Sequence, residues 1–205
     1  KAGVDCDKAS FREAYVYAER ELARTRHILP EHDFHDLLLI KMRLELQWLS
    51  ENGRFAPADV EAKAHEIADF CYGYARDCID RARPVLDELC KKYPLVLVSN
   101  FYGNVETVLR DFELDKYFVK VIESAVVGVR KPDPQIFGLG VEALGLKPEQ
   151  VLVIGDSYRK DIVPAESIGC KVLWIKGKGW TAEEDEQLHP GIISDLHEVL
   201  SFLAE

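Results

Sequence analysis

The sequence predicts an α/β protein, with a doubly wound parallel sheet over residues 83–205 and a helical domain over residues 1–82. Two observations lead to this prediction. In the first domain the apolar side chains recur only at helical spacing, whereas the second alternates continuous apolar runs with stretches of helix length. Continuous runs indicate strands buried on both faces of a sheet, joined by right-handed crossovers. These runs cover residues 95–98, 119–122, 151–154 and 172–175.

Length, composition and charge restrict the class of protein. The 205 residues are 47% hydrophobic and 30% charged, as in ordinary globular proteins, and allow one large domain or one domain with an insert. The net charge of −10 repels phosphate backbones, so we expect no nucleic-acid partner. No apolar run approaches the ~20 residues of a membrane span and no signal segment opens the chain, so we expect a cytoplasmic protein without a membrane partner. Five cysteines without a C-x-x-C pair predict reduced thiols.

Three helices are expected in the first domain. Ser10 opens a sequence with the spacing of a capping box, from which a first helix extends to about Arg26. A second helix follows from Asp33 and ends at Gly53. Pro57 begins the third helix, because proline is tolerated in a first helical turn.

Polar residues stand at the ends of the expected strands, where ligands of open α/β sheets gather. Ser99 and Asn100 end the first run and supply a hydroxyl, an amide and backbone N–H groups suited to phosphate oxygens. Lys131 precedes a helix and could neutralise an anion at the neighbouring strand ends. Asp156 ends the third run and Asp161 follows it. Two such carboxylates suit a hard divalent cation that retains water, which describes magnesium.

Each of these features also has an ordinary structural interpretation. Ser99 and Asn100 can be turn formers, and Lys131 can belong to a solvated basic turn. Asp156 can cap a helix and Asp161 can be a solvated helical residue. The residues alone leave these alternatives open.

Taken in order, the strand-end residues resemble the haloacid dehalogenase superfamily of hydrolases. Three of that family's four motifs match Ser99, Lys131, and the segment from Gly155 through Asp156 to Asp161. The resemblance is close from about residue 84 to about residue 176. The helical domain looks like the family's mobile helical cap, which is inserted after the first strand of the core.

The resemblance implies phosphoryl transfer through a covalent aspartyl-phosphate, with Mg2+ as cofactor. Ser99 would hydrogen-bond the transferring phosphoryl group with help from the Asn100 backbone, and Lys131 would bridge nucleophile and phosphate. Asp156 would be a direct metal ligand. Asp161 would orient a metal-bound water, or it would orient the direct metal ligands without binding the metal itself.

The chain departs from the family in its first motif, an Asp-x-Asp that supplies the nucleophile and the general acid/base. Asp5 and Asp7 have this spacing, but too few apolar residues precede them for a buried strand, so we interpret them as a loop before the first helix. We therefore expect the nucleophile upstream of Lys1, in an extension of roughly 10–25 residues. Its strand would lie in the middle of the sheet, between the strands that end at Ser99 and Ile154.

Several functions remain open within the resemblance. Dehalogenases of the family lack the paired magnesium carboxylates, so a phosphatase of small phosphorylated metabolites is favoured over a 2-haloacid dehalogenase. The other alternative is a catalytically inactive phosphate- or metal-binding interaction module. The substrate is not predicted, and neither is the choice between monomer and homodimer. Candidate cap residues for specificity are Arg24, His27, Arg43 and Trp48.

Overall fold

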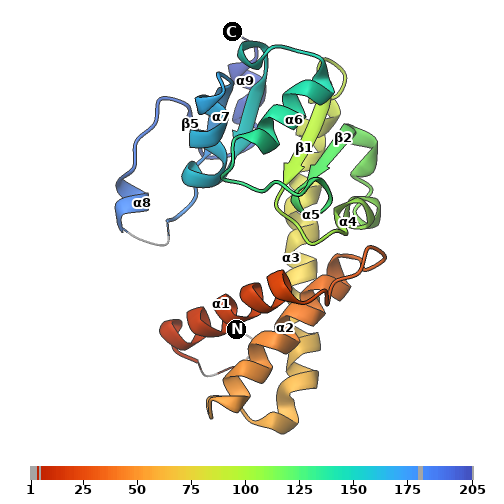
Figure 1. Cartoon of the computed structure of the whole chain (residues 1–205), viewed down its shortest axis with the longest axis vertical. Helices are drawn as coiled ribbons and strands as arrows, with labels where there is room; N and C mark the ends of the chain where they lie inside the picture. The colour runs from red at the N-terminus through yellow and green to blue at the C-terminus, as the bar shows by residue number, and fades with distance from the viewer. Residues whose placement is uncertain (1–3, 5, 180–181, 205) are drawn as a thin grey trace. The chain divides into compact units, whose positions relative to one another are not determined.

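The computed structural model describes residues 4, 6–179 and 182–204 (Figure 1). Contacts divide the chain into two compact units. The first, here called the helical unit, consists of Lys1–Asp80 and Tyr102–Asp115. The second, here called the α/β unit, consists of Arg81–Phe101 and Lys116–Glu205.

The helical unit is built from long helices. These are α1 (Lys8–Arg24), α2 (Phe34–Glu51), the 3-10 helix η1 (Pro57–Asp59), the first part of α3 (Val60–Leu89), and α4 (Val105–Asp111). Its core lies between α1, α2 and α3, where Ala14, Ala64 and Ala68 are completely buried. Small side chains at these positions let the helices approach closely. Within the described residues, no helix of the protein is long and apolar enough to cross a membrane.

The cap of α1 differs from the expected one. Asp7, not Ser10, is the N-cap, and its carboxylate accepts hydrogen bonds from the Ser10 backbone N at 2.8 Å and from Ser10 Oγ at 2.7 Å. An aspartate at this position satisfies two donors of the first turn, so the helix begins two residues before the predicted cap. Asp7 thus belongs to the start of a helix, while Asp5 lies outside the described residues. The cap of α2 at Asp33 is as predicted.

Helix α3 continues through the place where the sequence changes character. Pro84 lies inside the helix, although an interior proline costs about 3 kcal/mol. Val85 and Leu89, which follow it, are buried in a core cluster of the α/β unit, and this burial offsets the lost hydrogen bond. Helix α3 is therefore continuous across the predicted domain boundary at residues 82–83.

Helix α4 packs on the helical unit although it follows the first strand in sequence. Asn104 Nδ2 donates to the His32 carbonyl at 2.9 Å, and Thr107 Oγ1 donates to the Pro30 carbonyl at 2.6 Å. Phe112, just after α4, stacks on Tyr72 with ring centroids 5.3 Å apart. Residues from two distant parts of the sequence thus complete one unit.

The α/β unit contains parallel strands in two sheets (Figure 1). One sheet pairs β1 (Leu95–Ser99) with β2 (Phe118–Glu123), and the other has the order β3 (Leu152–Gly155), β4 (Lys171–Ile175), β5 (Ile192–Ile193). The four predicted strands and their parallel pairing are confirmed. The fifth was not predicted, because two residues give no usable pattern.

The other elements are η2 (Asp115–Tyr117), α5 (Ser124–Val127), α6 (Gln135–Leu144), η3 (Pro148–Gln150), the π-helix η4 (Tyr158–Ile162), α7 (Val163–Ser167), α8 (Ala182–Glu186) and α9 (Glu198–Phe202).

Strands β1 and β3 each have a partner on one side only within the described part of the chain. Both nevertheless contribute to one core, because Val98 of β1 and Val153 of β3 pack with the buried Ile136 of α6. Their residues are half-buried, whereas the sequence predicted burial on both faces. A strand with one open edge keeps part of its surface accessible. That open edge explains the difference.

Candidate functional site

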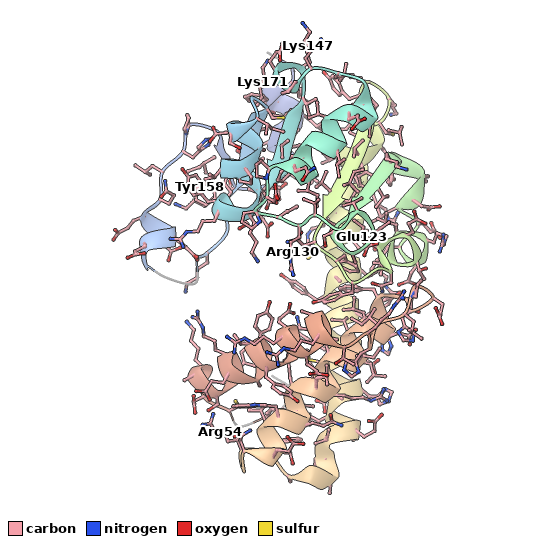
Figure 2. All side chains as sticks on the ribbon, in the orientation of Figure 1. Arg54, Glu123, Arg130, Lys147, Tyr158 and Lys171 are labelled. Carbon is pink, nitrogen blue, oxygen red and sulfur yellow. The ribbon has the colours of Figure 1, made fainter. Side chains whose placement is uncertain are left out.

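Lys131 and Asp161 form a buried ion pair in the α/β unit. Lys131 Nζ lies 2.7 Å from Asp161 Oδ1, and the exposed fractions of the two side chains are 17% and 6%. The Lys131 ammonium also lies 5.5 Å from the centre of the Phe137 ring. Figure 2 labels Arg130, the residue before Lys131, and Tyr158, at the start of the helix that carries Asp161. This packing rules out the solvated basic turn that the sequence left open for Lys131.

The local backbone fixes the position of Asp161. It lies in η4, and its Oδ2 accepts a hydrogen bond from the Ser157 backbone N at 3.0 Å. Single turns of π-helix often occur at functional sites. A Cβ atom at Gly155 would lie 2.4 Å from Cβ of Asp161, so only glycine permits this close approach at the end of β3. Both carboxylate oxygens of Asp161 are therefore held by donors, and the solvated helical role is excluded.

Asn100 connects the end of β1 to the Lys131 segment. Its Oδ1 accepts from the Lys131 backbone N at 2.8 Å, and its Nδ2 donates to the Lys131 carbonyl at 3.0 Å. The pair of bonds clamps the backbone of Lys131 and so aims its side chain. Because the amide is engaged in this way, a contact of Asn100 with phosphate can involve only its backbone, which was also the implication of the family resemblance.

Ser99 and Asp156 end β1 and follow β3, and their side chains are free. The Ser99 hydroxyl is half-buried and has no hydrogen-bond partner among the described residues. Asp156 is exposed, and its carboxylate likewise has no partner in the described part of the chain. The Asp156 carbonyl accepts from Trp174 Nε1 at 3.0 Å, which holds the backbone of the residue. One hydroxyl and one carboxylate thus remain available to a ligand.

The donor set is compatible with a magnesium ion but incomplete. Among the described residues no group of three or more His, Cys, Asp or Glu side chains could hold a metal ion. Mg2+ commonly uses one or two protein carboxylates and takes its other oxygens from water and substrate phosphates. The exposed Asp156 carboxylate fits the role of a direct ligand. Asp161 already balances the charge of Lys131, so it fits an indirect role better.

The sequence analysis missed the end of β2. Glu123 ends this strand and is buried, with an exposed fraction of 4%, and Figure 2 labels it in the α/β unit. The hydroxyl of Ser124, which follows it, accepts from the Phe101 backbone N at 3.2 Å and so braces the turn after Ser99 and Asn100. The rule applied to the other strand ends, a polar residue directly after an apolar run, would have found both.

Comparison with known proteins shows the family to which the chain belongs. A family model for haloacid dehalogenase-like hydrolases matches residues 8–169. The chain belongs to this family. A glyceraldehyde 3-phosphate phosphatase of Pyrococcus furiosus is 37% identical over 101 residues, which are 48% of this chain and 41% of that protein. A phosphoserine phosphatase of Thermus thermophilus is 36% identical over 92 residues, 45% of this chain and 36% of that protein. The matched part spans less than half the length of these relatives.

Solved structures of the family share the fold. A HAD phosphatase from Thermococcus onnurineus has a TM-score of 0.53 and 23% identity, with 95% of this chain and 88% of that chain covered. A 2-haloacid dehalogenase from Pseudomonas syringae has a TM-score of 0.52 and 20% identity, with 96% and 92% covered. The protein therefore has the Rossmann-like α/β core of the haloacid dehalogenase-like hydrolases, combined with helices. At these identities the likeness concerns the fold alone.

Proposed function

We propose that the protein is a magnesium-dependent hydrolase of small phosphomonoesters. The observation that supports this most is the largely buried pair of Lys131 and Asp161, together with the side chains of Ser99 and Asp156, which have no hydrogen-bond partner among the described residues. An ammonium held in place by a carboxylate supplies positive potential without reorganisation, which is what a developing phosphoryl charge requires. The phosphatase names of the two curated relatives favour the same chemistry.

Each residue has a role in this proposal. Ser99 donates its hydroxyl proton to a phosphoryl oxygen, and the backbone at Asn100 contributes to phosphate binding. Lys131 neutralises charge between nucleophile and phosphate, while Asp161 and the Asn100 amide hold it in place. Asp156 would hold the metal ion directly, and Asp161 would support the site without binding the ion. The ion, when bound, polarises the phosphoryl oxygens and lowers the repulsion between phosphate and carboxylate.

The nucleophile in this proposal is an aspartate on a strand that lies between β1 and β3. The open edges of these two strands support that position. The aspartate carboxylate attacks phosphorus, the ester P–O bond breaks, and the leaving alkoxide takes a proton from the second acid of the Asp-x-Asp motif. Water, deprotonated by the same acid, then attacks the acyl phosphate, which releases inorganic phosphate and restores the aspartate.

The helical domain predicted over residues 1–82, nearly all of which lies in the helical unit, has the role of the cap in this proposal. Caps that close over an active site exclude water and bulky polymers, so the substrate is a small phosphorylated metabolite. A cytoplasmic location and a monomeric or homodimeric state stay predictions from the sequence.

Phosphate release from a generic phosphomonoester, measured on the native protein that contains residues 1–205, tests this function. Asp156→Asn keeps the shape of the side chain but removes its charge, so we expect at least a roughly tenfold lower activity. Asp115→Asn, at an exposed aspartate whose side chain has no partner among the described residues, is the matched control and should leave activity unchanged.

Three outcomes would contradict the proposal. Full activity of Asp156→Asn, or full activity in excess chelator, would remove the magnesium site. Halide release from a 2-haloacid without phosphate release would indicate a dehalogenase. Phosphate binding without turnover in the native protein would indicate a non-catalytic binding module.

A further inference from the structure

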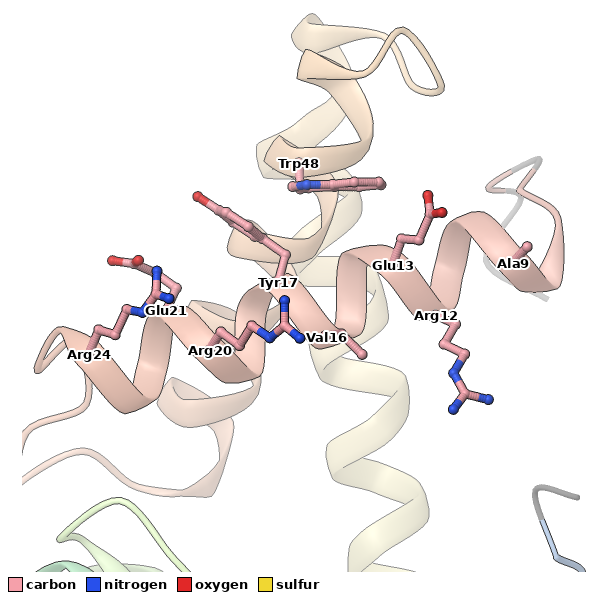
Figure 3. A pocket seen from close by; sticks show the side chains of 9 residues that line it. All are labelled: Ala9, Arg12, Glu13, Val16, Tyr17, Arg20, Glu21, Arg24 and Trp48. Atoms are coloured by element: carbon pink, nitrogen blue, oxygen red, sulfur yellow. The ribbon is translucent and has the colours of Figure 1, made fainter.

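A groove in the helical unit collects arginine side chains. We call it the α1 groove; it is lined chiefly by Arg12, Val16, Tyr17, Arg20, Arg24 and Trp48. Its volume is about 570 Å3, within the range of small-molecule sites. Figure 3 shows the arginines projecting from α1 and Trp48 standing on the neighbouring helix α2.

Arg20 and Arg24 lie on one side of α1, because they are four positions apart. Arg12 also lines the groove, but Figure 3 shows its side chain extending away from Trp48. Arg20 and Arg24 are one turn apart, about 6 Å along the axis, which lets two guanidinium groups reach a single oxyanion. Val16 lies between Arg12 and Arg20 and gives the groove an apolar floor.

The guanidinium groups of these arginines are available to a ligand. None of the three forms a salt bridge or a side-chain hydrogen bond within the described residues. Lys8, Arg26 and Arg76 likewise form no salt bridge there, whereas four other cations of the same unit are paired with carboxylates. Those pairs are Lys41 with Glu19, Arg43 with Glu61, Arg54 with Glu13, and Lys63 with Glu66.

Two carboxylates, those of Glu13 and Glu21, also line the groove, and both are already engaged. Glu13 forms a salt bridge with Arg54 at 3.0 Å. Glu21 accepts from His27 Nε2 at 2.9 Å, and its pKa is lowered mainly by this hydrogen bond, so it stays ionised. Glu13 and Glu21 therefore cancel only part of the positive charge, and the groove keeps an excess of cations that no described side chain of the unit balances.

The wall of the groove is aromatic. Tyr17 and Trp48 have ring centroids 6.4 Å apart with their planes tilted by 36°. Arg54 lies over the Trp48 ring, with its guanidinium carbon 5.7 Å from the centroid. Tyr17 is 40% exposed, so this pair is a surface and not part of the core. Such a wall offers a face on which a flat ring can stack.

We propose that the α1 groove binds a small organic oxyanion attached to a planar ring, with the oxyanion between Arg20 and Arg24 and the ring against Tyr17 and Trp48. The shared chemistry is the oxyanion, which can be a phosphate or a carboxylate. Binding at this groove can be measured without the proposed phosphatase activity, because none of its residues belongs to the strand ends.

Tryptophan fluorescence of the native protein reports binding, and because the chain has three tryptophans, the part of the signal lost in Trp48→Phe is the part that belongs to Trp48. Phenyl phosphate and benzoate are titrated in chelator, so that no metal-dependent chemistry takes place, and phenol serves as the neutral analogue. We expect a saturable signal with at least one of the two anions, weakened by added salt, and none with phenol. Phenyl phosphate alone would assign a phosphate ligand, and benzoate alone a carboxylate ligand.

Variants test the assignment to this groove. Arg20→Gln with Arg24→Gln should weaken binding by roughly tenfold or more, the scale of losing charged hydrogen bonds. Arg26→Gln is the matched control, since Arg26 is exposed, close in sequence and outside the groove, and it should change affinity less than about twofold. Circular dichroism checks that all variants are folded.

Four results would overturn the proposal. They are equal binding of phenol, unchanged affinity of the double arginine variant, a fluorescence change that persists in Trp48→Phe, and no saturable binding of either anion.

Discussion

Lys131 and Asp161 form an ion pair, and substitutions of each residue can separate its contribution to stability from its contribution to activity. Replacing Lys131 by Met leaves a buried carboxylate without its cation, which costs about 3–5 kcal/mol. We expect that Lys131→Met lowers the unfolding free energy by this order, measured by urea denaturation. If the native protein is active, kcat/KM falls by roughly 10² or more, the scale of one preorganised contact.

A double-mutant cycle with Asp161→Asn provides the control. Because the second change removes the isolated charge, the double variant should be more stable than Lys131→Met alone. Strictly additive losses would show that the two side chains do not depend on each other.

The raised pKa of the buried Glu45 predicts how the stability of the protein changes with pH. The side chain is 3% exposed, its Oε1 has no hydrogen-bond partner, and desolvation raises its pKa from 4.5 to about 7 against the opposing effect of Lys41. Between pH 4.5 and 7 the folded protein holds a proton that the unfolded chain has released. The contribution of Glu45 to the free energy of unfolding is therefore fully present below pH 4.5 and is lost as the pH rises to about 7.

Thermal unfolding between pH 4.5 and 8 measures this effect. Glu45→Gln should lack the decline, so its stability relative to the unmodified protein rises by roughly 3 kcal/mol across the range. Glu51→Gln, at the exposed end of the same helix α2, should keep the decline. Parallel curves for Glu45→Gln and the unmodified protein would refute the prediction.

At the scale of elements, the turn between β3 and η4 depends on one glycine. A Cβ at Gly155 would meet Asp161 at 2.4 Å, so Gly155→Ala should displace Asp161 and with it Lys131. We expect a loss of about 1–3 kcal/mol in unfolding free energy. Gly138→Ala, within α6, meets no atom within 4 Å and should be neutral or stabilising by up to about 1 kcal/mol. Equal effects of both substitutions would show that the close approach is relieved without cost.

The elements that the sequence predicts well are those with a long repeated pattern. The four apolar strands and the helices α1 and α2 follow directly from periodicity. Where several local arrangements compete, sequence alone cannot choose between them. Asp7 displaces Ser10 as the cap of α1, and burial of Val85 keeps α3 helical past Pro84.

The same limit applies to the candidate site. The chemical type of a residue and its position near the end of a predicted strand are enough to identify the candidates Ser99, Lys131, Asp156 and Asp161. The partners of these side chains depend on contacts between distant segments. The clamp between Asn100 and the Lys131 backbone spans 31 positions and has no local signal. Whether Asp161 faces a metal or an ammonium is likewise decided by the fold, because both arrangements need only a carboxylate at that position.

At the scale of the whole molecule, the open edges of β1 and β3 predict a pattern of hydrogen exchange. Backbone N–H groups of these strands that do not bond to β2 or β4 should exchange rapidly in residues 1–205. When the Asp-x-Asp strand is present, the same amides should become protected, while those facing β2 and β4 change little. Protection of both edges in the 205-residue protein alone would exclude an inserted strand there.

The division of the helical unit between two segments has a consequence for synthesis on the ribosome. Phe112 fills the space beside Phe34 and Tyr72, and Asn104 closes the bond to the His32 carbonyl. A nascent chain that has emerged only as far as residue 80 therefore lacks part of its own hydrophobic interior and must wait for β1 and the following turn to be translated. Its three long helices would be exposed to chaperones during that interval, and a protein truncated before Phe112 would lose these contacts permanently.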